Sequence, residues 1–181
     1  VEEITLIAIA IIRLGATRRA PLAWAVASEA ISRLRGVDPD DEVGLQKAEV
    51  ELTAFVSNLR IQMGKLEPEK EAAKQIAADV FKFLDMGNVA RAYIEYRSGE
   101  LLDIVVDGFT QHLAASAEPA SSWAECVDAF EGVDRIPLMT VHKSKGLEYD
   151  TILFVGLDDK MWWSYSPDNP EGLSTFFVAL S

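Results

Sequence analysis

The sequence has a single cysteine, Cys126, among its 181 residues, and only two histidines. One cysteine excludes an internal disulfide framework and fits a reducing compartment, so we expect a cytoplasmic protein. No group of Cys and His residues with metal-ligand spacing surrounds Cys126. We therefore expect no metal site in this chain and expect the thiol to fill the core.

Long hydrophobic runs are missing as well. The longest apolar stretch near the start, residues 4–12, is far too short to span a bilayer and follows two glutamates. A secretory signal would instead begin with positive charge and end at a small-residue cleavage site. We therefore expect no membrane partner.

Basic residues are outnumbered in this chain. Its 17 Lys and Arg face 29 Asp and Glu, which gives a formal net charge of −12. Such a chain is not expected to coat DNA non-specifically, because phosphate binding depends on Lys and Arg. A local DNA-contacting loop within a larger protein is still compatible with this charge. The 49% apolar and 25% charged content is typical of a soluble globular protein.

The first 131 residues predict an almost entirely helical region. Apolar residues recur at helical spacing in the ranges 2–14, 21–35, 45–63, 68–84 and 101–113. Breaks are expected at Gly87-Asn88 and in a small-residue linker at 114–120. Ser122 and Glu125 have the spacing of a capping box, which predicts a further short helix.

Three residues in this region have the chemistry of a single-strand binder. Tyr93, Tyr96 and Arg97 could stack on bases, as aromatic and Arg side chains do in such proteins. At helical spacing, however, tyrosines more often belong to the core, and we favour that interpretation. His112 is likewise expected to be a hydrogen-bonded structural histidine.

A small basic cluster flanks the end of the first helix. Arg13, Arg18 and Arg19 could contact phosphate groups. Basic side chains more often solvate a helix terminus, where they also favour the helix dipole. We favour the second interpretation.

The last fifty residues change character. Two short β-branched runs, 136–141 and 151–157, predict buried strands, with a polar turn from His142 to Glu148 between them. Thr140 and His142 are expected on the same side of the first strand, because side chains alternate along a strand. Ligands of open α/β sheets gather at the carboxyl ends of strands, where this turn lies.

The polar turn offers several groups to a ligand. Gly146 permits a tight turn or a close approach of the backbone. Lys143 offers a cationic donor, and the Glu148 carboxylate can accept two hydroxyl hydrogen bonds. From chemistry alone, a plain strand-turn-strand with a solvated loop is an equal alternative.

The run Thr140-Val-His-Lys-Ser-Lys-Gly-Leu-Glu148, followed by a hydrophobic stretch and Gly156-Leu-Asp-Asp159, resembles motif V of superfamily 1 DNA helicases of the UvrD/Rep/PcrA type. The resemblance implies that Thr140, His142 and Lys143 contact DNA. It implies that Glu148 meets the ribose hydroxyls of ATP and that Gly146 keeps the turn tight beside it.

The same resemblance implies an architecture. Residues 1–131 would be a helical insertion domain like the family's subdomain 2B. Residues 132–181 would be part of the second RecA-like motor domain, an α/β fold of the P-loop NTPase type with parallel strands. The expected fold class is therefore mostly α, with a partial RecA-like α/β segment at the end.

A weaker resemblance closes the chain, where residues 170–181 are similar to the start of the family's motif VI. The motif VI Arg, which would reach the γ-phosphate, would follow directly after Ser181. The sequence also contains no Gly-x4-Gly-Lys-Ser/Thr phosphate loop. No catalytic set is complete, so we expect this chain by itself to hydrolyse no ATP and to bind no cofactor.

The function implied for a parent protein is that of an ATP-dependent DNA helicase. It would move along single-stranded DNA and unwind duplex DNA, with ATP and Mg²⁺ as cofactors. Its partners would be both forms of DNA and the first motor domain of the same chain. Two alternatives are open: a non-catalytic helical interaction or regulatory module, and part of a helicase-nuclease subunit related to RecB or AddA.

Overall fold

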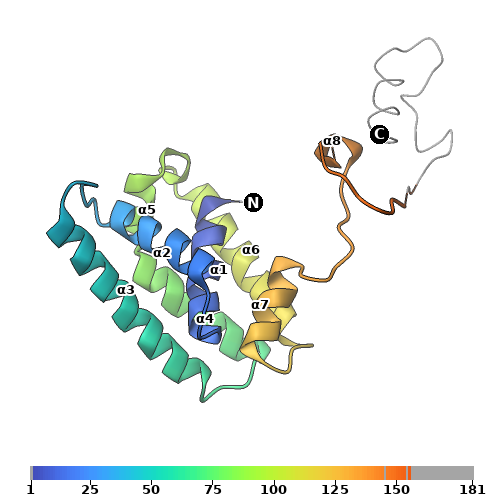
Figure 1. The fold of residues 1–181 in the computed structure, drawn as a ribbon, viewed down its shortest axis with the longest axis horizontal. Helices are drawn as coiled ribbons and strands as arrows, with labels where there is room; N and C mark the ends of the chain where they lie inside the picture. The colour runs from blue at the N-terminus through green and yellow to red at the C-terminus, as the bar shows by residue number, and fades with distance from the viewer. Residues whose placement is uncertain (1, 145, 154, 156–181) are drawn as a thin grey trace, which may run out of the picture. The chain divides into compact units, whose positions relative to one another are not determined.

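The computed structural model describes residues 2–144, 146–153 and 155, and its chain divides into two compact units (Figure 1). The first unit is Val1–Val133 and the second is Asp134–Ser181. No helix in the described ranges is both long enough and apolar enough to cross a membrane.

Nearly all the regular structure described is helical, which confirms the mostly α class. The elements are α1 Glu3–Ala16, α2 Pro21–Leu34, α3 Glu42–Met63, α4 Lys70–Leu84, α5 Met86–Ala92, the 3₁₀ turn η1 Ile94–Tyr96, α6 Glu100–Ala117, α7 Trp123–Glu131 and α8 Val141–Ser144. The first eight of these lie in the first unit. The description of residues 1–131 as a 2B-like insertion domain stays a prediction.

Helix α1 is the central helix of the first unit. Ile4, Ile11 and Ile12 are fully buried, and α1 contacts α2, α3, α4, α6 and α7. Gly15 permits the close approach of α3, because a Cβ at this position would lie 2.7 Å from the sulfur of Met63. A helix that is apolar on almost every side is expected at the centre of a bundle.

Helix α3 confirms the most regular periodicity in the sequence. Its inward stripe is Ala48, Leu52, Val56, Leu59 and Met63. The helix begins where Asp41 accepts a hydrogen bond from the backbone N–H of Gly44 at 3.0 Å. This carboxylate satisfies one of the free donors of the first turn.

The expected helix break at Gly87-Asn88 is wrong, because both residues lie inside α5. The break is at Asp85, which has a φ of 64° and accepts hydrogen bonds from the N–H groups of Gly87 (2.9 Å) and Asn88 (3.4 Å). Aspartate tolerates the left-handed conformation better than most residues and is a strong N-cap. One residue therefore ends α4 and begins α5.

The expected small-residue linker at 114–120 is also wrong for its first half. Helix α6 continues to Ala117, and Ala114 and Ala117 are buried against its neighbours. Small side chains let helices approach closely, so the composition that suggested a linker serves packing here.

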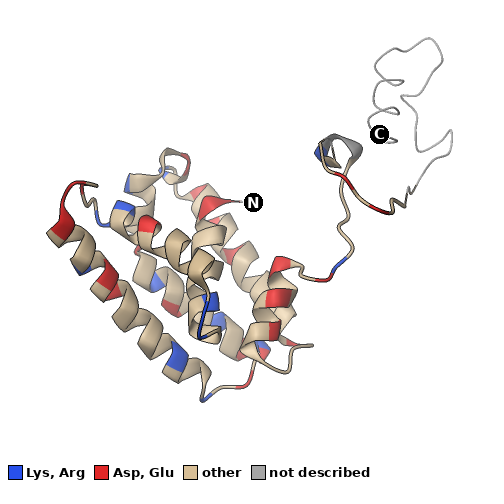
Figure 2. Cartoon of the chain, in the orientation of Figure 1, with Lys and Arg blue, Asp and Glu red and all other residues tan. Residues whose placement is uncertain are grey.

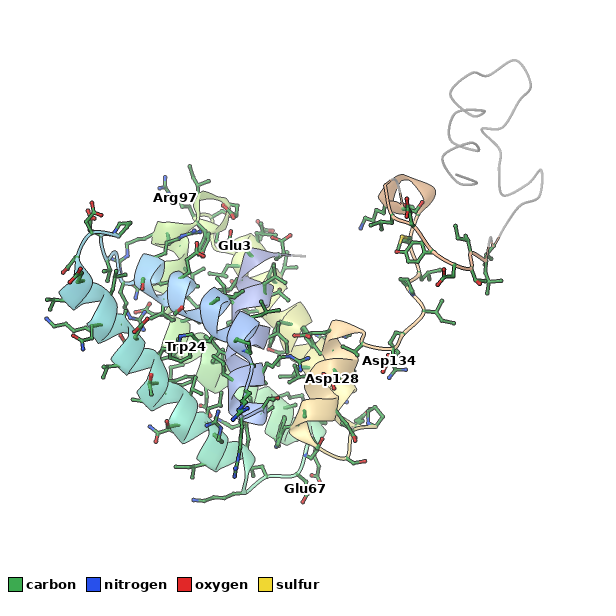
Figure 3. The ribbon with its side chains drawn as sticks, in the orientation of Figure 1. Glu3, Trp24, Glu67, Arg97, Asp128 and Asp134 are labelled. Atoms are coloured by element: carbon green, nitrogen blue, oxygen red, sulfur yellow. The ribbon has the colours of Figure 1, made fainter. Side chains whose placement is uncertain are left out.

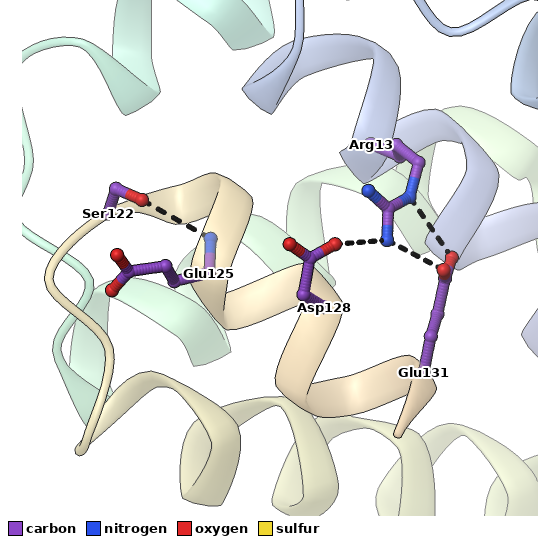
Figure 4. Close-up of polar contacts among 5 residues, drawn as sticks. All are labelled: Arg13, Ser122, Glu125, Asp128 and Glu131. Carbon is purple, nitrogen blue, oxygen red and sulfur yellow. Dashed lines mark hydrogen bonds and ion pairs between the residues drawn. The ribbon is translucent and has the colours of Figure 1, made fainter. Parts of the chain in front are cut away.

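The predicted capping box at the start of α7 is confirmed for its serine half, whereas the Glu125 carboxylate binds the N–H of the residue before Ser122 (Figure 4). Ser122 Oγ accepts from the N–H of Glu125 at 3.2 Å, and the Glu125 carboxylate accepts from the N–H of Ser121 at 2.8 Å. At the other end, Gly132 has a φ of 74° and closes the helix in the left-handed conformation.

Residues 136–140 do not form the predicted strand; they have no regular secondary structure, and Val141 already belongs to α8. Ile136 and Leu138 are 86% and 95% exposed. Residues 151–153, within the second predicted strand, are also irregular, while 154, 156 and 157 lie outside the described residues. A strand needs a neighbour for its backbone N–H and C=O groups, and no described segment pairs with either run. The RecA-like sheet therefore stays a prediction.

Candidate nucleotide and DNA-binding segment

The candidate site is the described part of the segment 138–158, which is built around one helical turn. In α8 the carbonyl oxygen of Thr140 accepts hydrogen bonds from the backbone N–H groups of Lys143 (2.9 Å) and Ser144 (3.2 Å). Thr140 therefore stands at the start of the turn. The expected alternation of Thr140 and His142 on a strand is replaced by helical spacing in this structure.

A left-handed residue follows the turn. Gly146 has a φ of 82°, and nothing lies within 4 Å of the place where a Cβ would stand. The N–H of Leu147 donates to the Ser144 carbonyl at 2.9 Å and fixes the direction of the exit. A residue with a side chain would be strained in this conformation, so glycine is needed for the backbone and not for packing.

The two flanks of the turn meet through their side chains. The hydroxyl of Tyr149 lies 3.8 Å from the sulfur of Met139. Met139 is half-buried, and Tyr149 is 41% exposed. The hydroxyl donates to the thioether sulfur, which is a weak acceptor, so this contact joins the two flanks only weakly.

The predicted ligand-binding groups differ in how the structure presents them. Thr140, Lys143 and Glu148 are exposed. Neither the Lys143 ammonium nor the Glu148 carboxylate has a hydrogen-bond or ion-pair partner among the described residues. The side chain of His142 lies outside the described part of the chain. In the described part of the chain, the turn thus presents an exposed cation before Gly146 and an exposed anion after it.

The two tyrosines considered for base stacking belong to the core, as we favoured. Tyr96 is fully buried and donates its hydroxyl hydrogen to Glu2 at 3.1 Å, while Tyr93 is 5% exposed. Burial, followed by the hydrogen bond to Glu2, raises the pKa of Tyr96 to about 12. Rings buried in this way cannot stack on bases.

The basic cluster at the end of α1 divides into two parts. Arg13 donates to Asp128 at 2.8 Å and to Glu131 at 2.6 Å, so it joins α1 to α7 (Figure 4). Burial alone would lower the pKa of the Arg13 guanidinium, but these two carboxylates offset it and raise the pKa. Arg18 and Arg19 are exposed. The prediction that these basic side chains are solvated thus fits Arg18 and Arg19, and it is wrong for Arg13.

The remaining single residues have structural roles, as expected. His112 Nε2 lies 3.2 Å from the carbonyl oxygen of Phe130, and the two rings are 4.6 Å apart. Cys126 is fully buried, and burial raises the pKa of its thiol to about 11. Neither residue has the setting of a catalytic or metal-binding group.

Residues 111–181 match the family model of the UvrD-like helicase C-terminal domain. The match includes the whole candidate segment and the motif VI-like residues 170–181, which lie outside the described residues. No matching relative was found among curated proteins, and no matching chain among solved structures. The resemblance is therefore confirmed for residues 111–181, which are similar to the C-terminal domain of UvrD-like helicases.

Sequence reasoning missed the helical turn at Val141–Ser144. Two signals for it were present, since Thr140 is a common residue at a helix start and Gly146 stands where a helix commonly ends. The β-branched run before the turn outweighed them. Sequence reasoning also missed the contact of Met139 with Tyr149, because side chains ten residues apart meet only once the turn geometry is known.

Proposed function

We propose that this chain is part of an ATP-dependent DNA helicase of the UvrD-like type, in which the segment 138–158 couples nucleotide to DNA. The observation that supports this most is the arrangement of the turn. Lys143 and Glu148 are exposed, without a partner among the described residues, on either side of a left-handed glycine, within a stretch that matches the helicase family.

The DNA side of the proposal rests on Thr140 and Lys143. A hydroxyl and an ammonium group are both donors to phosphate oxygens, and both side chains are exposed here. His142 is included with them because of the resemblance. Contacts of this kind position a strand without reading its sequence, which suits an enzyme that must move along any DNA.

The nucleotide side rests on Gly146 and Glu148. A carboxylate can accept from both ribose hydroxyls at once, and the open space above Gly146 lets a ligand approach the backbone. These two residues account only for the binding of the ribose of ATP. The phosphates and Mg²⁺ need a phosphate loop, which the sequence lacks, so we assign them to the first motor domain of the parent.

The coupling we propose is a shift of one short loop. The flanks of the loop are joined by a weak hydrogen bond from the Tyr149 hydroxyl to the Met139 sulfur, and Gly146 can absorb a change in backbone direction. When Glu148 binds the ribose of ATP, the position of Thr140 and Lys143 relative to the DNA strand would change. ATP, when bound, supplies the free energy of its hydrolysis to the parent enzyme.

The test separates the two ligands in a helicase that carries these 181 residues. Glu148→Gln should raise the KM for ATP about tenfold, because a charged acceptor of two hydrogen bonds is lost, and should leave the affinity for single-stranded DNA unchanged. Lys143→Gln should weaken binding to single-stranded DNA. It should also reduce the slope of the logarithm of the binding constant against the logarithm of the salt concentration by about 0.7, the value for one phosphate contact.

Lys47→Gln provides the control, because Lys47 is an exposed lysine on α3, outside the matched segment. It should change neither measurement. Equal and small effects of Glu148→Gln and Lys143→Gln on both ligands would contradict the proposed division of roles.

A further inference from the structure

A groove in the helical unit carries an inference that does not depend on the helicase assignment. It lies between α1 and α2, with η1 nearby, and has a volume of about 390 Å³. Its lining includes Glu3, Leu6, Val26, Glu29, Arg33 and Tyr93. Figure 3 labels Glu3 near the beginning of α1 and Trp24 on α2, two residues before Val26.

The apolar side of the groove is open to solvent. Of the residues that line it, Leu6 is 48% exposed and Val26 is 43% exposed; Leu22, one helical turn before Val26 and beyond the lining, is 83% exposed. Three large aliphatic side chains on two adjacent helices are therefore left uncovered by the unit itself. Covering them would bury apolar surface that now contacts water, which is favourable.

The other end of the groove is ionic. Arg33 donates to Glu3 at 3.0 Å and to Glu29 at 3.1 Å, so a single guanidinium serves two carboxylates. Leu22, Val26, Glu29 and Arg33 follow one face of α2 at helical spacing, over about 16 Å of the helix axis. The surface is thus apolar at one end and net negative at the other.

The first unit as a whole is negatively charged, like the ionic end of the groove. Residues 1–133 contain 13 Lys and Arg and 22 Asp and Glu, a net charge of −9, and the acidic residues are spread along its helices (Figure 2). Such a surface repels nucleic acid and attracts basic partners. A long, partly apolar strip also exceeds what a small ligand would cover.

We infer that this α1–α2 groove binds an amphipathic helix of a basic protein partner. The partner helix would place apolar side chains, spaced i, i+4 and i+7, against Leu6, Leu22 and Val26. Its Lys or Arg residues would pair with Glu3 and Glu29, whose carboxylates now share Arg33. This is the helix-in-groove mode, in which apolar anchors give affinity and flanking charges set orientation.

The experiment uses the complete 181-residue chain and two synthetic peptides of about 18 residues, a length that can form a stable helix on a surface. Both peptides carry Leu at positions i, i+4 and i+7; the first has Lys at its polar positions and the second has Glu. Binding is measured by fluorescence anisotropy. The Lys peptide should bind, and the Glu peptide should bind at least about tenfold more weakly.

The matched variants locate the site. Leu22→Gln combined with Val26→Gln should weaken binding of the Lys peptide about tenfold or more, because two apolar contacts are lost. Val43→Gln combined with Val50→Gln makes the same kind of change at exposed positions of α3, 61% and 63% exposed. That control should stay within about twofold of the parent.

Three results would overturn the inference. Both peptides could bind equally, both double variants could lose the same affinity, or the chain could self-associate through Leu22 and Val26. The last result, read by sedimentation of the chain alone, would show that a second copy occupies the groove instead of a basic partner.

Discussion

At the scale of single residues, Tyr96 shows how a polar group is accommodated in the helical core. Its ring is fully buried, and its hydroxyl donates to Glu2, which precedes α1, at 3.1 Å. The residue thereby ties η1 to the beginning of α1. A hydrogen bond to a carboxylate in a partly buried setting stabilises the fold more than one between neutral groups.

Tyr96→Phe should lower the free energy of unfolding by about 1–2 kcal/mol at neutral pH, because the carboxylate of Glu2 loses its donor. The folded state raises the pKa of Tyr96 from 10.0 to about 12. Between these values the unfolded chain releases the proton and the folded chain keeps it, so the parent loses stability as the pH rises. The difference between the parent and Tyr96→Phe should therefore shrink between pH 10 and 12.

Urea denaturation at several pH values measures this difference directly. Tyr149→Phe is the control, because Tyr149 is 41% exposed and lies in the other unit. A difference between the parent and Tyr96→Phe that stays constant from pH 7 to pH 12 would contradict the proposed role of the hydroxyl.

At the scale of elements, a single guanidinium adds two ion pairs to the packing of helix α7 on α1. Arg13 donates to Asp128 and Glu131, and 21% of its side chain is exposed. Arg13→Ala should lower the free energy of unfolding by about 1–2 kcal/mol, because two carboxylates lose their shared partner in a half-screened setting. Thermal unfolding followed by circular dichroism measures the loss.

Arg33→Ala gives the comparison for this prediction. Arg33 also serves two carboxylates, but 48% of its side chain is exposed, so its removal should cost well under 1 kcal/mol. Equal losses in the two variants would mean that burial does not govern the strength of these ion pairs.

The elements also show what the sequence could predict. The helices were predictable because each carries its own periodicity, as α3 does from Ala48 to Met63. Asp85 was harder, because an aspartate at positive φ has no signature in the sequence until the capping contacts to Gly87 and Asn88 are seen. Strands depend on partners, and the apolar run around Ile136 and Leu138 has none among the described residues.

The candidate site was predictable in composition and not in geometry. The order of Thr140, Lys143, Gly146 and Glu148 could be interpreted from the sequence, and the left-handed φ of Gly146 agrees with the expected tight turn. The single helical turn of α8 was not expected, because four residues are too few to show a period.

At the scale of the whole molecule, each of the two units carries a different proposed binding site. The first unit, Val1–Val133, is acidic and helical, and the groove proposed to take a basic helix lies in it. The second unit, Asp134–Ser181, carries the turn proposed to meet nucleotide and DNA. The family match extends from residue 111 and so includes the end of the first unit as well as the second.

Hydrogen–deuterium exchange of residues 138–153 in the helicase that carries this chain is the most direct test of the two-ligand turn. Amide exchange reports local opening, which a bound ligand suppresses. We predict slower exchange in this segment with a non-hydrolysable ATP analogue alone and, separately, with single-stranded DNA alone. Unchanged exchange with either ligand would contradict the claim that one turn serves both.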